Sequence, residues 1–324
     1  MDVKIYNDIT ETIGNTPMVK LHKITHGMNN LFAKLEFFNP GGSIKDRMAL
    51  FIINEAERKG LIRGEIVENS SGNTGAALAM ISSIRGYRAT ITIPDKMSLE
   101  KINLIKAFGA EVVVTPTDVP YDSEESYYSV ARRLSEERKA FYPDQYNNPD
   151  NIKCHYETTG PEIWNQMDGN IDFLIAGIGT GGTISGIGRF LKEKDPDIKI
   201  IGVDPVGSIF YNYFKEGKMV EPKVYKVEGI GEDYLVKAVD FSVIDDIIQV
   251  NDKESFLMAR RLAREEGIFA GGSSGSAMVA AMNVAATNKG KNIVVIFPDS
   301  GYRYLSKFYN DDWMRKNGFM EGER

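Results

Sequence analysis

One lysine in a glycine-rich segment stands out as a residue that could do covalent chemistry. Residues 39–47 read NPGGSIKDR, and Ser43 followed by Asp46 resembles a capping box at the start of a helix. Lys45 is therefore expected in the first helical turn, where the helix dipole favours a neutral amine over an ammonium. A neutral lysine amine is the form that makes an imine with an aldehyde. A solvated lysine at a helix start is the alternative.

A second segment offers hydroxyl and amide groups to an anion. Ser70, Ser71, Gly72, Asn73 and Thr74 follow a short β-rich stretch and precede an apolar run typical of a helix. Backbone N–H groups at a helix N-terminus, together with such side chains, suit a carboxylate. An ordinary N-cap cluster would have the same composition, so the segment alone leaves both interpretations open.

A third segment, Gly177–Thr183, is rich in glycine and carries two threonines between an expected strand and helix. Its backbone N–H groups and hydroxyls suit a phosphate. It also matches G-x-G-x-x-G, the pattern of dinucleotide-binding loops. That alternative needs an acidic residue at the end of the next strand, and Asp204 lies near the required spacing.

A fourth segment, Gly271–Ser276, contains three glycines and three serines at another helix start, where Ser273 offers a hydroxyl. A Gly/Ser segment of this kind is often only a tight turn. In open α/β sheets, however, ligands bind where strands end and helices begin. The four segments together supply an amine, a phosphate cradle, a carboxylate site and a hydroxyl. Pyridoxal 5′-phosphate, a phosphorylated aldehyde that reacts with amino acids, needs all four.

Alternating strands and helices position these segments. This alternation predicts an α/β fold with doubly wound, mostly parallel sheets. The polar, Asn-rich stretch 144–152 is expected to join two domains. The expected strands are residues 31–36, 65–68, 89–94, 111–115, 171–178, 199–203, 246–250 and 292–297. The expected helices are residues 45–59, 73–84, 98–107, 126–139, 183–192, 253–266 and 274–286.

Composition narrows the class of protein. The chain has 324 residues, a net charge of −6 and no run of apolar residues long enough to span a membrane. Its mild acidity argues against a general nucleic-acid binder. One cysteine, Cys154, rules out an intrachain disulfide and suits a reducing cytoplasm. With one cysteine and three well-separated histidines, no metal site is expected.

Several motifs resemble the fold-type II, β-replacement branch of pyridoxal-phosphate enzymes, which includes cysteine synthase and cystathionine β-synthase. The resemblance covers nearly the whole chain, and finer features favour a cystathionine β-synthase catalytic core. It implies a fold like that of tryptophan synthase β, with helices on both faces of two sheets. It also implies a small, mobile domain at 47–150 and a larger cofactor-binding domain formed by 1–46 and 151–324. The motifs are residues 13–18, 40–47, 71–75, 179–183, 202–208, 227–231, 271–275, 298–301 and 306–314.

The same resemblance assigns roles to single residues. Lys45 would hold the cofactor and act as the catalytic base, Asn73 would contact the cofactor's phenolic oxygen, and Ser273 its ring nitrogen. The phosphate would lie on Gly179, Thr180, Gly181, Gly182 and Thr183. The substrate would contact Ser70, Ser71, Gly72, Asn73, Thr74, Gln145 and Gly229.

Two acidic residues depart from the animal enzymes, which carry an aromatic residue directly after the glycine that matches Gly231. Here Glu232 and Asp233 follow, and they could bind the amino group of a nucleophile or handle a proton. A solvated pair in a loop is the alternative. No haem-binding extension and no C-terminal regulatory domains are expected, and hence no regulation by haem or S-adenosylmethionine.

The resemblance implies β-elimination and β-replacement through an aminoacrylate. The leading expectation is that serine, or an activated serine, and homocysteine give cystathionine. Cysteine synthase, a hydrogen sulfide-releasing cysteine lyase and an enzyme making a diamino acid are alternatives within the same chemistry. O-acetylserine or cysteine could then replace serine, and sulfide could replace the thiol. An NAD-dependent oxidoreductase and a non-catalytic relative are alternatives from other classes. The family suggests a homodimer.

Overall fold

The computed structural model describes residues 5–25 and 30–321 and divides the chain into two compact units. The first, called unit 1, comprises Met1–Pro17, Glu36–Met97 and Lys101–Asp144. The second, unit 2, comprises Met18–Leu35, Ser98–Glu100 and Gln145–Arg324. The domain boundaries expected near residues 47 and 150 stay a prediction, and each unit is described by itself.

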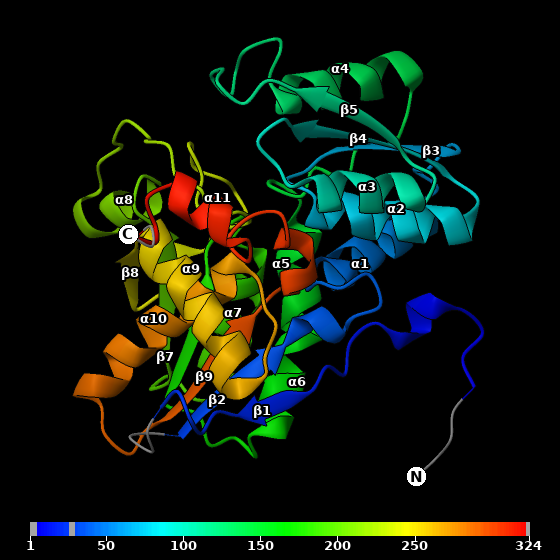
Figure 1. Ribbon diagram of the computed structural model, residues 1–324. Coiled ribbons are helices and arrows are strands. Elements are labelled where there is room, and N and C mark those ends of the chain that lie inside the picture. Colours follow the sequence, from blue (N-terminus) through cyan, green and yellow to red (C-terminus); the bar gives the residue numbers. More distant parts are fainter. Residues whose placement is uncertain (1–4, 26–29, 322–324) are drawn as a thin grey trace. The chain divides into compact units, whose positions relative to one another are not determined.

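Unit 1 is built on a three-stranded parallel sheet in the order β3-β4-β5. Helix α4 lies on one face of this sheet, and α1, α2 and α3 lie on the other (Figure 1). Strand β3 is buried along its whole length, as expected for a parallel strand covered on both faces. The bounds are α1 Lys45–Arg58, β3 Glu65–Asn69, α2 Asn73–Arg85, β4 Arg88–Pro94, α3 Leu99–Ala107, β5 Glu111–Thr115 and α4 Tyr127–Arg138.

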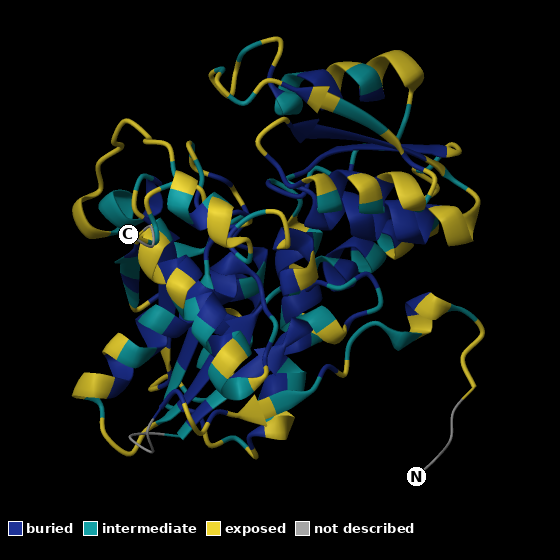
Figure 2. Cartoon of the chain, in the orientation of Figure 1, coloured by how far each residue is buried: buried dark blue, intermediate teal, exposed yellow. Residues whose placement is uncertain are grey.

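Unit 2 is built on a six-stranded sheet in the order β1-β2-β9-β6-β7-β8, in which only β1 runs antiparallel to its neighbour. The strands are β1 Met18–Lys20, β2 Asn30–Leu35, β6 Phe173–Gly177, β7 Lys199–Pro205, β8 Asp246–Val250 and β9 Asn292–Phe297. Helix α7, backed by α5 and α6, and helix α10, backed by α9, pack on this sheet. The strands and these helices form the buried centre of the unit (Figure 2).

The helices of unit 2 are α5 Pro149–Glu157, α6 Thr159–Gln166, α7 Gly182–Lys194, α8 Phe210–Glu216, α9 Asp252–Arg261, α10 Gly272–Thr287 and α11 Asp311–Lys316. Within the described part of the chain, no helix is both long and apolar enough to cross a membrane.

The predicted α/β class, with mostly parallel sheets and helices on both faces, is confirmed. The stretch 144–152, expected to join two domains, also contains the start of a helix, because α5 begins at Pro149. The Asn148 side chain accepts a hydrogen bond from the Asp150 N–H, and proline is favoured in a first helical turn. The polar residues there mark a helix start. The helix expected to reach residue 266 ends at Arg261 and continues as one π-helical turn, Leu262–Glu266.

Candidate functional site

Lys45 lies at the start of α1 in unit 1 and is half-buried. The predicted capping box is wrong, because the N-cap position is Ile44, which has no side-chain cap. Ser43 Oγ accepts a 3.3 Å bond from the Lys45 N–H. The Asp46 carboxylate bends back further and accepts from the Gly41 N–H at 2.6 Å. A Cβ at Gly41 would lie 2.5 Å from that carboxylate, so glycine is required for the loop to close here.

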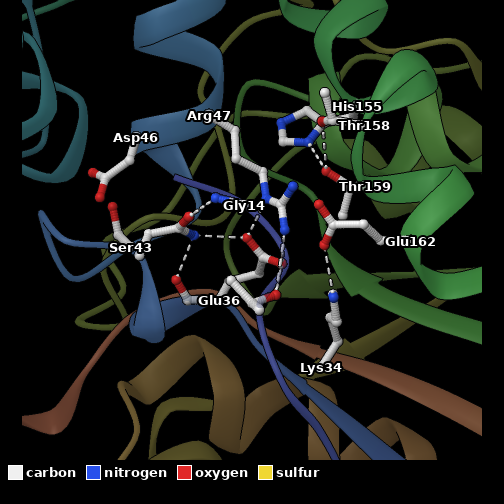
Figure 3. A network of polar contacts seen from close by, with 12 residues as sticks. Gly14, Lys34, Glu36, Ser43, Asp46, Arg47, His155, Thr158, Thr159 and Glu162 are labelled. Atoms are coloured by element: carbon white, nitrogen blue, oxygen red, sulfur yellow. Dashed lines mark hydrogen bonds and ion pairs between the residues drawn. The ribbon is translucent and has the colours of Figure 1, made fainter. Parts of the chain in front are cut away.

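A buried ion pair holds the loop that carries Lys45. Arg47 donates from Nε and Nη2 to the two carboxylate oxygens of Glu36, at 2.7 and 2.9 Å (Figure 3). Glu36 also accepts from Thr16 Oγ1 and from Asn39 Nδ2, while Asn39 Oδ1 accepts from the Gly14 N–H. Glu36 therefore fixes both ends of the segment 39–47 through charge-assisted hydrogen bonds.

The segment Ser70–Thr74 connects β3 to α2 in unit 1. Ser70 Oγ accepts hydrogen bonds from the N–H groups of Gly72 and Gly75, both at 2.9 Å, and so shapes the turn. Gly72 is the N-cap of α2, with a φ of +119° that only glycine adopts readily. Asn73 begins α2 and is 9% exposed. Lys45 and Asn73 thus each begin a helix, and α1 packs against α2.

The glycine-rich segment of unit 2 is packed too tightly for side chains. A Cβ at Gly179 would lie 2.5 Å from the backbone oxygen of Gly229, and one at Gly181 would lie 2.2 Å from Val239 Cγ2. Gly181 is also the N-cap of α7, with a φ of +86° and no side-chain cap. The first N–H groups of a 13-residue helix therefore remain directed at this segment, which suits an anion.

Two side chains of α5 orient the two threonines of this segment. Asn151 Nδ2 donates to Thr180 Oγ1 at 3.0 Å and to the backbone oxygen of Gln145 at 2.8 Å. His155 Nε2 lies 3.2 Å from Thr183 Oγ1, and its Nδ1 lies 2.9 Å from Thr159 Oγ1. Figure 3 shows the His155 ring directed at Thr159. Asn151 and His155 are not among the residues predicted from the sequence, because the polar composition around Asn151 predicts a junction between domains.

Ser273 lies in the first turn of α10 and is 3% exposed. The turn before it is fixed by Asp299, whose backbone oxygen accepts from the Gly271 N–H at 2.9 Å. The Asp299 carboxylate accepts from Tyr304 Oη at 2.6 Å. Burial, followed by the charge of Asp299, raises the pKa of Tyr304, so this phenol stays protonated and donates.

A backbone hydrogen bond joins the loop that contains Glu232 and Asp233 to the glycine-rich segment Gly177–Thr183. The Gly231 N–H donates to the Ile178 oxygen at 2.7 Å. The Glu232 N–H donates to Ser208 Oγ at 3.1 Å, and the Glu232 oxygen accepts from the Ile209 N–H at 3.2 Å. Glu232 is half-buried and Asp233 is exposed. The two bonds of Glu232 described here use its backbone, so they do not depend on its side chain.

Asp204, which the dinucleotide alternative would need, is completely buried. Its Oδ2 accepts from the Tyr211 N–H at 2.9 Å, and its Oδ1 has no hydrogen-bond partner among the described residues. Burial raises the pKa of Asp204 to about 7, and the Ser208 hydroxyl and the Tyr211 N–H oppose this shift only in part. A carboxyl group with no exposed surface cannot contact a ribose, which argues against a dinucleotide site.

The residues expected to form the site fall into two groups. Unit 1 holds Lys45 and the segment 70–74, whereas unit 2 holds Gln145, the segment 179–183, Gly229, Glu232, Asp233 and Ser273. Within unit 2, close packing and hydrogen bonds join Gly229, Gly231 and Gln145 to the segment 179–183 or to its supports.

Comparisons with known proteins agree with these features. The profile of the family described as "Pyridoxal-phosphate dependent enzyme" matches residues 9–299. Cystathionine beta-synthase of Mus musculus is 48% identical over 327 residues, covering 99% of this chain and 58% of the mouse protein. The protein of that name from Saccharomyces cerevisiae is 43% identical over 333 residues, covering 98% of this chain and 66% of its own length. The chain thus spans less than two thirds of these curated relatives.

Solved structures extend the similarity to the fold. The crystal structure of O-ureido-L-serine synthase has a TM-score of 0.88 and 35% identity, covering 99% of this chain and 98% of that one. That of a hydrogen sulfide-producing enzyme from Fusobacterium nucleatum has a TM-score of 0.87 and 39% identity, covering 93% of this chain and 100% of that one.

Proposed function

The chain belongs to the family of pyridoxal-phosphate dependent enzymes, and on that premise we propose that it catalyses β-replacement on serine or an activated serine, with homocysteine as the nucleophile and cystathionine as the product. The observation that carries the proposal is the 48% identity to a cystathionine beta-synthase over 99% of this chain. The glycine packing around residues 179–183 supports it independently.

The residues present fit the phosphate of this cofactor. The N-terminus of α7 offers backbone N–H groups and a positive dipole end, and tight packing keeps Gly179, Gly181 and Gly182 free of side chains. Thr180 and Thr183 would add hydroxyls, oriented by Asn151 and His155. The segment would therefore hold a phosphate without a lysine or arginine of its own.

Lys45 is proposed to hold the cofactor by its aldehyde carbon. When bound, pyridoxal phosphate supplies an electron sink for the charge left at the substrate Cα after its proton is removed. The Lys45 amine would take that proton and return it at the end of the reaction. The Glu36–Arg47 pair would keep the lysine in one place through both transfers, because it fixes the loop on either side.

The other site residues are assigned to orienting the cofactor, to its ring nitrogen and to the substrate carboxylate. Asn73 is proposed to orient the phenolic oxygen of the cofactor, and Ser273 its ring nitrogen. A neutral serine at that nitrogen stabilises negative charge less than an aspartate would, which favours prompt loss of the β-substituent. The substrate carboxylate is assigned to Ser70, Ser71, Gly72, Asn73, Thr74, Gln145 and Gly229.

Glu232 and Asp233 are proposed to act on the second substrate or on the leaving group. Hydroxide leaves serine only when it receives a proton, and the Lys45 ammonium is the first donor, with the two carboxyl groups as the second. The exposure of Asp233 also suits a contact with the amino group of an incoming amino acid.

A second reaction on the same site is the release of hydrogen sulfide from cysteine. The neighbour from Fusobacterium nucleatum, described as a hydrogen sulfide-producing enzyme, is matched over its whole length and supports this alternative. Thiolate leaves without the proton that hydroxide needs, so this reaction would depend less on Glu232 and Asp233.

The decisive experiment compares three substrate pairs on purified holoenzyme: serine with homocysteine, cysteine with homocysteine, and O-acetylserine with sulfide. Mass spectrometry of the products should find cystathionine from the first pair. Turnover of the third pair alone would contradict the assignment. Borohydride should bleach the yellow protein and leave the cofactor's mass on the Lys45 peptide. Lys45→Ala should be inactive, whereas Lys59→Ala, at the other end of α1, should be active.

A homodimer in the cytoplasm is also proposed. The family resemblance supports the dimer, and a single, buried cysteine suits a reducing compartment. Light scattering of the purified chain tests the dimer: a monomer mass at micromolar concentration would contradict it.

A further inference from the structure

A cavity of about 320 Å³ lies within unit 1, and none of its lining residues belongs to the segments assigned to the reaction. Three of its lining residues, Glu65, Arg88 and Glu111, are the first residues of β3, β4 and β5. The three strands are parallel, so the cavity lies at their amino ends. The segment Ser70–Thr74 follows the carboxyl end of β3, so it lies at the other end of the strands of the same sheet. The cavity is therefore distinct from the proposed substrate loop.

Two acidic and two basic side chains line this cavity, so their formal charges cancel. Arg138 Nη1 lies 3.0 Å from Glu65 Oε1 and 2.8 Å from Glu111 Oε2, so one guanidinium joins both carboxylates. Arg88 Nη2 contacts Glu65 Oε2 at 3.0 Å, but 81% of the Arg88 side chain is exposed. Hydrogen bonds from Arg138 lower the pKa of Glu111, which stays ionised at neutral pH. Two acids and two bases in one lining favour a ligand that carries both signs of charge.

The rest of the lining is small and apolar, apart from a few polar side chains. Ala79, Ala89, Ala110 and Phe108 leave room for a hydrocarbon group. Ser82 also lines the cavity and is 1% exposed, and its Oγ has no hydrogen-bond partner among the residues described. A buried hydroxyl without a partner is costly, and a ligand that bonds to it would remove that cost.

We propose that this cavity binds a free α-amino acid with an uncharged side chain. The ligand carboxylate is assigned to Arg88, whose guanidinium is mostly exposed, and its ammonium to the Glu65–Glu111 side of the lining. The side chain of the ligand lies against the three alanines, and Ser82 Oγ donates to the second oxygen of the ligand carboxylate. This assignment goes beyond the proposed reaction and does not depend on it.

The test is calorimetric titration of L-leucine into the holoenzyme, with the cofactor's visible absorbance recorded in parallel. Leucine should bind in the millimolar range without changing the absorbance. Arg88→Gln should weaken binding about tenfold, as expected for loss of a charge-assisted bond. Arg85→Gln is the matched control, since Arg85 pairs with Glu57 and does not line the cavity. Capping either charge, as in N-acetyl-L-leucine or L-leucinamide, should abolish binding.

Two further variants separate binding from folding. Ala110→Leu should fill the cavity and remove binding while the serine-induced absorbance change persists. Ser82→Ala should weaken binding, whereas Ser83→Ala should not, because Ser83 Oγ already donates to the Met80 oxygen. No heat of binding at about 50 mM leucine, or equal affinity in Arg88→Gln and wild type, would overturn the assignment. Equal binding of either capped analogue would also overturn it.

Discussion

Arg47 and Glu36 form a two-point ion pair in which neither side chain has more than 2% of its surface exposed. Lys45 lies two residues before Arg47, in the segment that this pair closes. Both charges are compensated by the partner and by further hydrogen bonds from Thr16 and Asn39. Such a pair specifies a local geometry, and it becomes strongly destabilising when one member is removed.

Glu36→Gln should therefore lower the free energy of unfolding by about 3 to 5 kcal/mol, because it leaves the Arg47 guanidinium buried without its counter-charge. Urea denaturation followed by circular dichroism measures the change. Glu55→Gln on α1, which removes a surface pair with Arg58, should cost about 0.5 kcal/mol or less. If both substitutions lower the free energy of unfolding equally, the buried pair stabilises the fold no more than a surface pair does.

Gly181→Ala should reduce the retention of cofactor. The new methyl group would lie 2.2 Å from Val239 Cγ2, and the backbone would have to leave its left-handed conformation. Cofactor content is measured from the absorbance released in alkali. Gly217→Ala separates the two effects, because Gly217 also has a positive φ, +67°, but nothing lies within 4 Å of the position that a Cβ would take there. We expect normal cofactor content in that variant, and a similar loss in both would refute the packing argument.

The buried Asp204 should make stability fall as pH rises. Its native pKa is raised to about 7, whereas an unfolded aspartate titrates near 3.9. Between these values the native state binds the extra proton, so the stabilisation is greatest in acid and is lost as pH rises through about 7. Asp204→Asn should flatten this dependence.

Urea midpoints at about pH 5 and about pH 8 test this expectation. The difference between the two midpoints should be smaller in Asp204→Asn than in wild type. Asp312→Asn, whose side chain is 93% exposed in the wild type, should keep the wild-type difference. If Asp204→Asn shows the same difference between midpoints as wild type, the pKa of Asp204 is not raised in the native state.

Ser208→Ala should affect the second substrate more than the first. Ser208 Oγ accepts the Glu232 N–H at 3.1 Å, so its loss frees the loop that carries Glu232 and Asp233. Steady-state kinetics should give a severalfold higher KM for homocysteine with little change in KM for serine. Ser242→Ala, which removes a hydroxyl bonded to Asp240 in an exposed turn, should leave both constants unchanged. A rise confined to serine would contradict the proposed role of the loop.

The alternation of strands and helices could be predicted because buried parallel strands read as short apolar runs between turn residues. Strands β5, β8 and β9 have the predicted bounds. The helix α5 was missed for a physical reason: Asn148 and Pro149 are as favourable at a helix start as in a loop. The short helices α6, α8 and α11 were also missed, and packing against their neighbours matters more for such helices than propensity.

For the site, glycine positions carried more information than polar residues. The sequence predicts a role for Gly179, Gly181 and Gly182, because glycines directly before a helix leave the backbone N–H groups there accessible to an anion. Asn151 and His155 could not, since their importance depends on contacts with Thr180 and Thr183 that lie about 30 positions away. The Ser43 cap failed for a related reason, because Asp46 bonds to Gly41 instead.

The Gly231–Ile178 hydrogen bond has a consequence for how such enzymes diversify. Residues 232–235 lie between Gly231, fixed to the end of β6, and Val236, which is 5% exposed. Two of the bonds that hold position 232 use its backbone N–H and oxygen, so a change of side chain, other than to proline, leaves them in place. We expect that a relative's version of these four residues can be grafted here, and that the graft changes the choice of nucleophile while the backbone around residues 179–183 stays as it is.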